Sequence, residues 1–284
     1  MSDFFEILYS CRAMRRLKPD PVPEAMVEAI LKAAFRAPTS SNIQSYSVVV
    51  VRDREVLRKL APITSHQKHV LEAPVFLAFC ADLTRIAFAL DQRGHSIADN
   101  NMETGLVSSI DAALVGMSAS LAAESLGLQG VMIGAVRNDA TASAKVLGLP
   151  DRVYCVFGLC LGFPGEAPER KPRMDYAGMV HYDQYGRQRG AGDLAAHLAA
   201  YDAALAKHYR ATGRSTTDDS WTHDMDKKFH PWLRDKLRQQ LKDFNIKTLF
   251  KCLPNLSYLT ITFGAKHVNM DYERQLFGMK MSEA

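Results

Sequence analysis

The chain has 284 residues, of which 47% are hydrophobic and 23% are charged, and its formal net charge is +4. These values are typical of a globular protein that is long enough for one large domain or two modest ones. The mild charge, without a zinc-finger, RNP or basic-helix pattern, argues against a nucleic-acid partner.

The N-terminal half of the chain begins without the basic and apolar stretches of a signal peptide, so we expect a cytoplasmic protein. Apolar residues at helical spacing predict a short helix over residues 3–11. The next elements expected are a helix from Pro23 to Pro38, a strand over 46–51, a charged helix over 54–61 and a buried strand over 75–80. The strand over 46–51 is too apolar for a sheet face that is exposed to water.

The middle of the chain contains the longest predicted helix, over residues 103–127, after a variable excursion over 83–102. Gly127 is its expected C-cap, and three acidic residues, Asp111 among them, make it a poor membrane span. Small residues line its other faces, so we expect it to be buried in a core or in a subunit interface. Its stripe of large apolar residues is Leu106, Ile110, Leu114, Met117 and Leu121.

The C-terminal half predicts a short strand or turn, a capped helix, a third apolar strand and two further helices. Their ranges are 130–134, 141–147 with Gly148 as the cap, 152–163, 192–210 and 224–244. Helices and strands are intermixed with too few strict β-α-β alternations for a simple doubly wound sheet.

The cysteines are spaced without a C-x-x-C pair, which indicates reduced thiols of a cytoplasmic protein. Cys80, Cys155 and Cys160 lie in apolar runs and are expected to be buried. We find no set of His, Cys and carboxylate residues at metal-ligand spacing, and therefore expect no metal site.

Fixed cations and hydroxyl groups gather in stretches that are far apart in the chain. Residues 11–16 contain three arginines, residues 39–41 are Thr-Ser-Ser, and residues 171–173 add a lysine and an arginine. Arg12 and Arg15 are spaced i, i+3, so we expect both on one side of the chain. Each stretch alone is compatible with an ordinary charged loop, but together they suit a phosphate group. We therefore predict a phosphorylated cofactor.

The same stretches resemble those of the nitroreductase family of FMN enzymes, in its oxygen-insensitive nitroreductase and flavin reductase branch. The similar motifs are Cys-Arg-x-x-Arg-Arg-Leu from Cys11, Ala-Pro-Thr-Ser-Ser-Asn-x-Gln from Ala37, and Glu-Ser-Leu-Gly-Leu-Gln-Gly from Glu124. Gln-Lys-His from Gln67, Phe-Gly-Leu-Cys-Leu-Gly from Phe157 and Lys-Pro-Arg from Lys171 also have counterparts. The similarity covers roughly residues 3–240 and rests on the order and spacing of the motifs together.

The resemblance implies an α+β, three-layer α/β/α sandwich that forms a homodimer, with one FMN at each end of the dimer interface. Carried over by position, the cofactor-binding residues are Cys11, Arg12, Ala13, Met14, Arg15, Thr39, Ser40, Ser41, Gln67, His69, Met132, Ile133, Gly134, Ala135, Lys171 and Arg173. Residues 39–41 belong to the loop that the family places at the dimer interface. Because the flavin performs the chemistry and the protein tunes it, we assign no general acid or base.

The sequence departs from this branch at several positions. Cys11 and Ala13 replace a common His and Ser, and a thiol beside cations raises the hypothesis of a lowered pKa and easy oxidation. Thr212 and His230 occupy positions where the branch is expected to hold the 2′-phosphate of NADPH with arginines, although Arg210 and Arg214 flank the first of them. NADPH, NADH or both therefore remain candidates for the electron donor.

These features predict an oxidoreductase that takes electrons from NADPH or NADH and passes them, in ping-pong order, to a small planar acceptor such as a nitroaromatic, quinone or flavin. Two alternatives are a flavin-binding or storage module and an FMN enzyme with specialised chemistry, dehalogenation or flavin fragmentation. Residues 1–247 are expected to form the FMN domain. Alternating Leu259, Ile261 and Phe263 predict a strand in the extension 248–284, either along a partner subunit or in a poorly ordered tail.

Overall fold

A computed structural model describes residues 4–97, 102–186, 194–213, 220–230, 234 and 236–243. The helices are α1 (Phe4–Ser10), α2 (Glu24–Ala34), α3 (Arg54–Ile63), α4 (Lys68–Leu71), α5 (Thr84–Asp91), α6 (Met102–Ser125), α7 (Ala140–Leu147), α8 (Tyr176–Met179), α9 (Leu194–Ala211), α10 (Trp221–Phe229) and α11 (Leu237–Asp243), with 3₁₀ turns η1 (Ser40–Asn42) and η2 (Gly134–Asp139). The strands are β1 (Tyr46–Val51), β2 (Val75–Asp82), β3 (Gln129–Ile133) and β4 (Val153–Gly162).

The four strands form one sheet in the order β1-β2-β4-β3, and every neighbouring pair is antiparallel. The two central strands carry almost continuous apolar sequence because helices cover both of their faces. All eight residues of β2 are buried. The expected α+β class is therefore confirmed.

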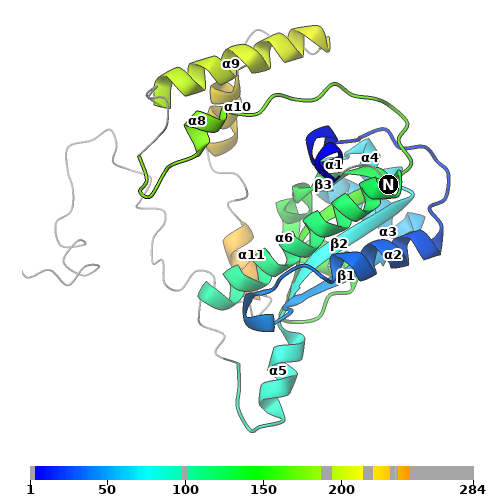
Figure 1. Cartoon of the computed structure of the whole chain (residues 1–284). Coiled ribbons are helices and arrows are strands. Elements are labelled where there is room, and N and C mark those ends of the chain that lie inside the picture. Colours follow the sequence, from blue (N-terminus) through cyan, green and yellow to red (C-terminus); the bar gives the residue numbers. More distant parts are fainter. Residues whose placement is uncertain are drawn as a thin grey trace, which may run out of the picture.

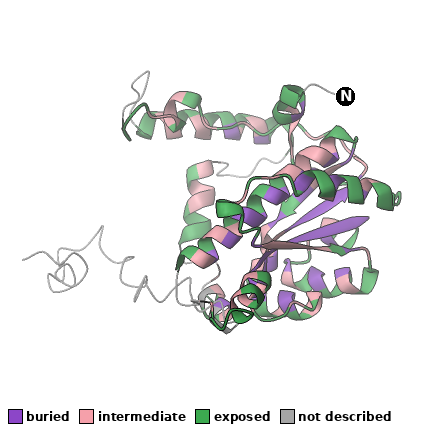
Figure 2. Ribbon diagram, turned by 60° about the horizontal axis from the view of Figure 1, so that its bottom comes forward, coloured by how far each residue is buried: buried purple, intermediate pink, exposed green. Residues whose placement is uncertain are grey.

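Two hydrophobic clusters lie on opposite faces of the sheet and make three layers (Figure 1). On one face, Ile30 of α2 and Val115 of α6 pack with Leu77 and Leu159 of the central strands. On the other face, Leu57 of α3 packs against the sheet together with α4 and α7. The buried colour of Figure 2 follows the strands and the inner faces of these helices. The predicted α/β/α sandwich is thus confirmed.

Helix α6 is the longest element and is long and apolar enough to cross a membrane by length and composition. In the fold it packs on the sheet instead, through small residues such as Gly116 and Ala119. Its large apolar residues face away from the sheet and are exposed: Leu106, Ile110, Leu114 and Met117. The side of α6 that packs on the sheet therefore carries small side chains, which let the helix lie close to the strands.

Two expectations about single elements are wrong. Strand β1 is not covered on all sides: Val50 is 37% exposed, because β1 lies at the edge of the sheet. The single helix expected over 224–244 is two helices, α10 and α11. The break follows from Pro231, because the residue before a proline avoids helical angles, and His230 is extended at φ −137° and ψ 108°. The tail 248–284 lies outside the described residues.

Candidate functional site

The arginine-rich stretch after α1 is held in place by backbone hydrogen bonds to the ends of two strands. Met14 N donates to Gly130 O at 2.9 Å, and Lys18 N donates to Phe163 O at 2.9 Å. The stretch is extended rather than helical, with an isolated bridge between Leu17 and Pro164. Helical spacing therefore does not apply to Arg12 and Arg15, because α1 ends at Ser10.

The loop after β4 is tied to the same stretch. Glu166 Oε1 accepts hydrogen bonds from the backbone N–H groups of Arg15 and Arg16, at 3.1 and 2.9 Å. The Nη1 atom of Arg12 donates to Pro168 O at 3.2 Å. Arg12 Nε is buried without a hydrogen-bond partner among the described residues. A buried donor that lacks a partner is rare in folded proteins and is consistent with a ligand that supplies the acceptor.

The Lys-Pro-Arg loop is positioned by two tyrosines of α9. Lys171 Nζ donates to the hydroxyl of Tyr209 at 2.9 Å and lies 4.8 Å from the centre of its ring. The hydroxyl of Tyr201 donates to Pro172 O at 3.2 Å. Arg173 Nη1 donates to the carbonyl of Lys171 at 3.1 Å, which curls the loop on itself. Sequence reasoning missed both tyrosines, whose only signal was their spacing on a helix.

The thiol of Cys11 lies beside a carboxylate as well as beside cations. Its Sγ donates to Glu124 Oε1 at 3.3 Å. Burial, followed by the negative charge and the hydrogen bond of Glu124, raises the pKa of Cys11 to about 11, against the lowering effect of Arg173. The hypothesis of a lowered pKa is therefore wrong, because the cations are outweighed. Because the charge of Arg173 acts on the pKa of Cys11, Arg173 lies near this thiol.

His69 is half-buried as the second residue of the short helix α4, two residues after Gln67, which forms the N-cap position. Burial lowers the pKa of His69, and the positive charge of Arg15 lowers it further. The fold therefore brings His69 close to Arg15, although they are far apart in sequence. A neutral imidazole can accept a hydrogen bond, which a charged one cannot.

The expected flavin-ring segment runs from the end of β3 into η2. Met132 is exposed, Ile133 is buried, and Gly134 and Ala135 are half-buried. The first N–H groups of a helical turn lack partners within the turn and are available to a ligand. Met14, in contrast, is 0% exposed, so its side chain belongs to the core rather than to a cofactor surface.

The loop of Thr39, Ser40 and Ser41 is held by a residue that sequence reasoning did not assign to the site, Asp111 of α6. Its Oδ1 accepts from Ser40 N at 3.1 Å. Its Oδ2 accepts from Ser45 N at 3.1 Å and from Ser45 Oγ at 2.9 Å. The signal in the sequence was an acidic residue next to the apolar stripe in the middle of the helix.

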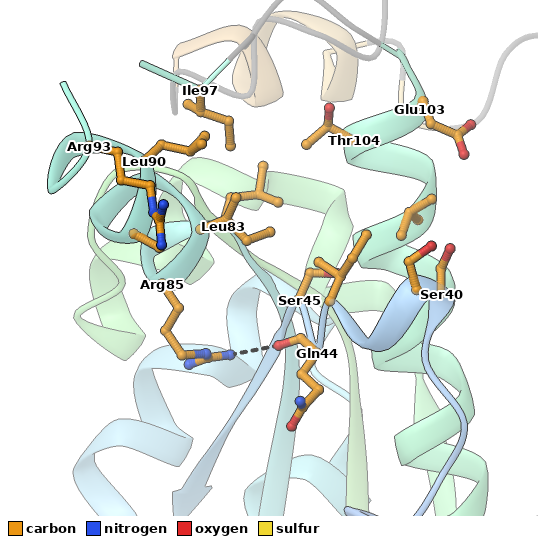
Figure 3. Close-up of a pocket in the computed structure, with 15 residues that line it drawn as sticks. Ser40, Gln44, Ser45, Leu83, Arg85, Leu90, Arg93, Ile97, Glu103 and Thr104 are labelled. Atoms are coloured by element: carbon orange, nitrogen blue, oxygen red, sulfur yellow. Dashed lines mark hydrogen bonds between the residues drawn. The ribbon is translucent and has the colours of Figure 1, made fainter. Parts of the chain in front are cut away.

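This loop borders a cavity of about 750 Å³ between α5 and α6 (Figure 3). Most of its wall is apolar, and the side chains of Ser40 and Ser41 lie at its edge. Arg85 crosses its lower end and donates to the carbonyl of Gln44 at 3.1 Å. A cavity of this size is typical of a small-molecule site.

The candidate residues form two groups that are separated along α6. The first group, around Cys11 and Arg12, contacts Glu124 near the C-terminal end of the helix. The second group, around Ser40, contacts Asp111. Thirteen residues of helix (124 − 111) separate these contacts, or about 20 Å at 1.5 Å per residue. A single protomer therefore does not bring the two groups together.

Thr212 stands at a position matched to an arginine of the branch, and its hydroxyl hydrogen-bonds to backbone carbonyls of α9. Its Oγ1 donates to His208 O at 2.9 Å and contacts Tyr209 O at 3.3 Å. Arg210 is exposed in the last turn of α9, and Arg214 lies outside the described residues. His230 is exposed at the end of α10.

Comparison with known proteins gives concordant matches. Residues 9–163 match the nitroreductase family, and residues 171–248 match the C-terminal domain of that family. An oxygen-insensitive NADPH nitroreductase of Salmonella typhimurium is 37% identical over 244 residues, which cover 84% of this chain and 98% of that protein. An FMN reductase [NAD(P)H] of Bacillus subtilis is 32% identical over 248 residues, 84% of this chain and 98% of that protein.

Solved structures agree with the sequence matches. A nitroreductase from B. subtilis superposes with a TM-score of 0.80 at 29% identity, covering 86% of this chain and 98% of its own. An NADPH:FMN oxidoreductase from Vibrio harveyi, complexed with NAD⁺, gives a TM-score of 0.76 at 29% identity, covering 85% of this chain and 97% of its own.

Proposed function

The chain belongs to the nitroreductase family, and from this premise we propose that it is an FMN-dependent NAD(P)H oxidoreductase. The observation that carries the proposal is the convergence of the two cationic stretches. Arg12 and the backbone at Arg15 are hydrogen-bonded to the loop that leads to Lys171. The charge of Arg173 acts on Cys11 and that of Arg12 acts on Glu124, so both cations lie near the first group of candidate residues.

The residues present fit an FMN phosphate. Arg12, Arg15, Lys171 and Arg173 supply charged donors, which form stronger hydrogen bonds to phosphate than neutral groups do. The unpartnered Arg12 Nε supports a ligand at this position. We assign the ribityl and ring contacts to Cys11, Ala13, Met14, Gln67, His69 and residues 132–135. Met14 contributes only backbone atoms, because its side chain is in the core.

Held by these residues, FMN would supply the two-electron chemistry that links NAD(P)H to a small planar acceptor such as a nitroaromatic, a quinone or a flavin. The protein's part is to bind and orient the cofactor with its cations and to hold a neutral His69 nearby, whose lowered pKa keeps it uncharged. No described side chain needs to act as a general acid or base in this scheme.

We further propose that the enzyme works as a homodimer with the flavin site at the interface. The exposed apolar stripe of α6 (Leu106, Ile110, Leu114 and Met117) is a surface that a second copy would cover. Dimerisation through α6 would also bring Ser40 and Ser41 of one copy close to the cations of the other. This resolves the separation of about 20 Å along α6 within one protomer.

We propose that the donor is not restricted to NADPH, because Thr212, just past the end of α9, is uncharged and its hydroxyl already donates to His208 O. We place the enzyme in the cytoplasm, consistent with the unpaired state of the four described cysteines. Residues 1–247 would form the FMN unit, and residues 248–284 an extension.

The test is anaerobic stopped-flow reduction of the purified protein by NADH and by NADPH in parallel. We expect a yellow protein whose flavin absorbance is bleached by both coenzymes and restored by a quinone or nitroaromatic. A colourless protein that cannot be reconstituted with FMN would refute the proposal. A yellow protein that neither coenzyme bleaches would indicate a flavin-storage module instead.

A further inference from the structure

The loop that carries Ser40 and Ser41 has an unfavourable backbone conformation. Ser41, Asn42 and Gln44 have φ angles of 47°, 56° and 53°. Residues other than glycine adopt such left-handed angles only at a cost in conformational energy. This conformation persists only where the surroundings impose it, so the loop requires an anchor.

Asp111 binds the loop on both sides of the left-handed residues. One carboxylate oxygen accepts from the backbone N–H of Ser40, before them, and the other accepts from the backbone N–H and hydroxyl of Ser45, after them. Asp111 and Ser45 are 0% and 1% exposed, so these bonds are shielded from water. The side chains of Ser40 and Ser41 remain exposed at the edge of the cavity.

We propose that Asp111 is a positioning residue for the flavin site: by fixing both ends of this loop it presents Ser40 and Ser41 to FMN across the dimer interface. Asp111 lies next to Ile110 in the exposed stripe of α6, so one helix carries both the dimer surface and the anchor of the loop. The inference rests on the proposed function. It adds a residue that does not touch the cofactor but determines how well the cofactor is held.

The experiment compares FMN affinity in wild type, Asp111→Asn and Asp139→Asn, by quenching of flavin fluorescence in refolded or flavin-stripped protein. Asn keeps the shape of the side chain but replaces one acceptor oxygen with a donor that faces the N–H of Ser45. We expect FMN to dissociate about tenfold more readily, which corresponds to the loss of one charged hydrogen bond. Exchange of the Ser40 and Ser45 amides with deuterium should become faster in the same variant.

Asp139→Asn is the matched control, because Asp139 also accepts from a backbone N–H, that of Ala142 at 2.9 Å, but caps α7 away from the loop. It should lower stability without changing FMN affinity or exchange in residues 38–46. An Asp111→Asn protein that is a folded dimer with unchanged FMN affinity would overturn the inference. Equal loss of affinity in both variants would do the same, because it would reveal a general effect of stability.

If Asp111→Asn does not fold, Ser45→Ala decides the matter. It removes only the hydroxyl that donates to Asp111 at 2.9 Å, and we expect a smaller loss of FMN affinity, about threefold. Unchanged affinity and unchanged amide exchange would overturn the inference. Failure of the proposed function looks different, because wild-type protein would then bind no FMN at all.

Discussion

At the scale of single residues, the proposed phosphate site depends on charges from two parts of the chain. Arg15 is placed by Glu166 and lies near His69, and Lys171 is placed by the hydroxyl and ring of Tyr209. Each cation is therefore held by a contact that the sequence alone did not indicate. A cation fixed before binding loses less side-chain entropy when it meets phosphate.

Arg15→Ala and Lys171→Ala should each weaken FMN binding by about 1.5–3 kcal/mol, because each removes a charged donor to phosphate. Isothermal titration of flavin-free protein with FMN measures this change. Lys32→Ala is the control: Lys32 is an exposed cation on α2 that pairs with Glu28 at 2.6 Å. If both site variants retain wild-type affinity while the protein still binds FMN, the phosphate site has been misplaced.

The pKa of Cys11 predicts a thiol that does not react at neutral pH. Since its pKa is raised to about 11, the reactive thiolate forms only in alkaline solution. The rate of alkylation by iodoacetamide, followed by mass spectrometry, should rise steeply as the pH approaches 11. Glu124→Gln should move this rise to lower pH, because it removes the negative charge that opposes ionisation. Rapid labelling of wild-type Cys11 at pH 7 contradicts this assignment.

At the scale of elements, the contact between α6 and the sheet depends on a glycine, which has no side chain. A Cβ atom on Gly116 would lie 2.3 Å from the Cζ atom of Phe157 in β4. The helix can therefore approach the sheet closely only with glycine at this position, and its large residues turn outward. The composition of α6 had indicated burial, but it did not indicate which side would face the sheet.

Gly116→Ala should destabilise the protein by about 1–3 kcal/mol through overpacking, measured as the free energy of unfolding in urea. Phe157→Leu removes ring atoms that the new methyl group would meet. The double variant Gly116→Ala, Phe157→Leu should therefore be more stable than the sum of the two single changes predicts. Additive effects would indicate that α6 shifts away from β4 instead of clashing with it.

At the scale of the whole molecule, the proposed homodimer would bring the two groups of site residues together. Leu114→Asp places a charge in the exposed stripe of α6, where burial of an unpaired carboxylate is costly. We expect the variant to sediment as a monomer and to lose most of its FMN, because the two groups of site residues separate. Ala33→Asp, an equally polar change on the exposed side of α2, should leave both properties unchanged. A monomeric variant with full flavin affinity would show that one protomer suffices.

The sequence by itself determined much of the local structure. Strand and helix assignments followed from periodicity and from glycine, as at Gly148, whose φ of 65° ends α7. It also determined the family, because the motifs that carry the resemblance are short and contiguous. Where a local signal was overlooked, as at Pro231, the prediction failed although the sequence contained the reason.

Only the tertiary structure decided how distant residues act on one another. The charge of Glu124 on Cys11, the tyrosines that hold residues 171–173 and the carboxylate of Asp111 beneath the serine loop are all contacts between segments far apart in the chain. Periodicity and propensity describe neighbours within a few residues, whereas electrostatic and hydrogen-bond partners are set by packing. For that reason the sequence indicated what this protein binds, and the fold decided how the site is held.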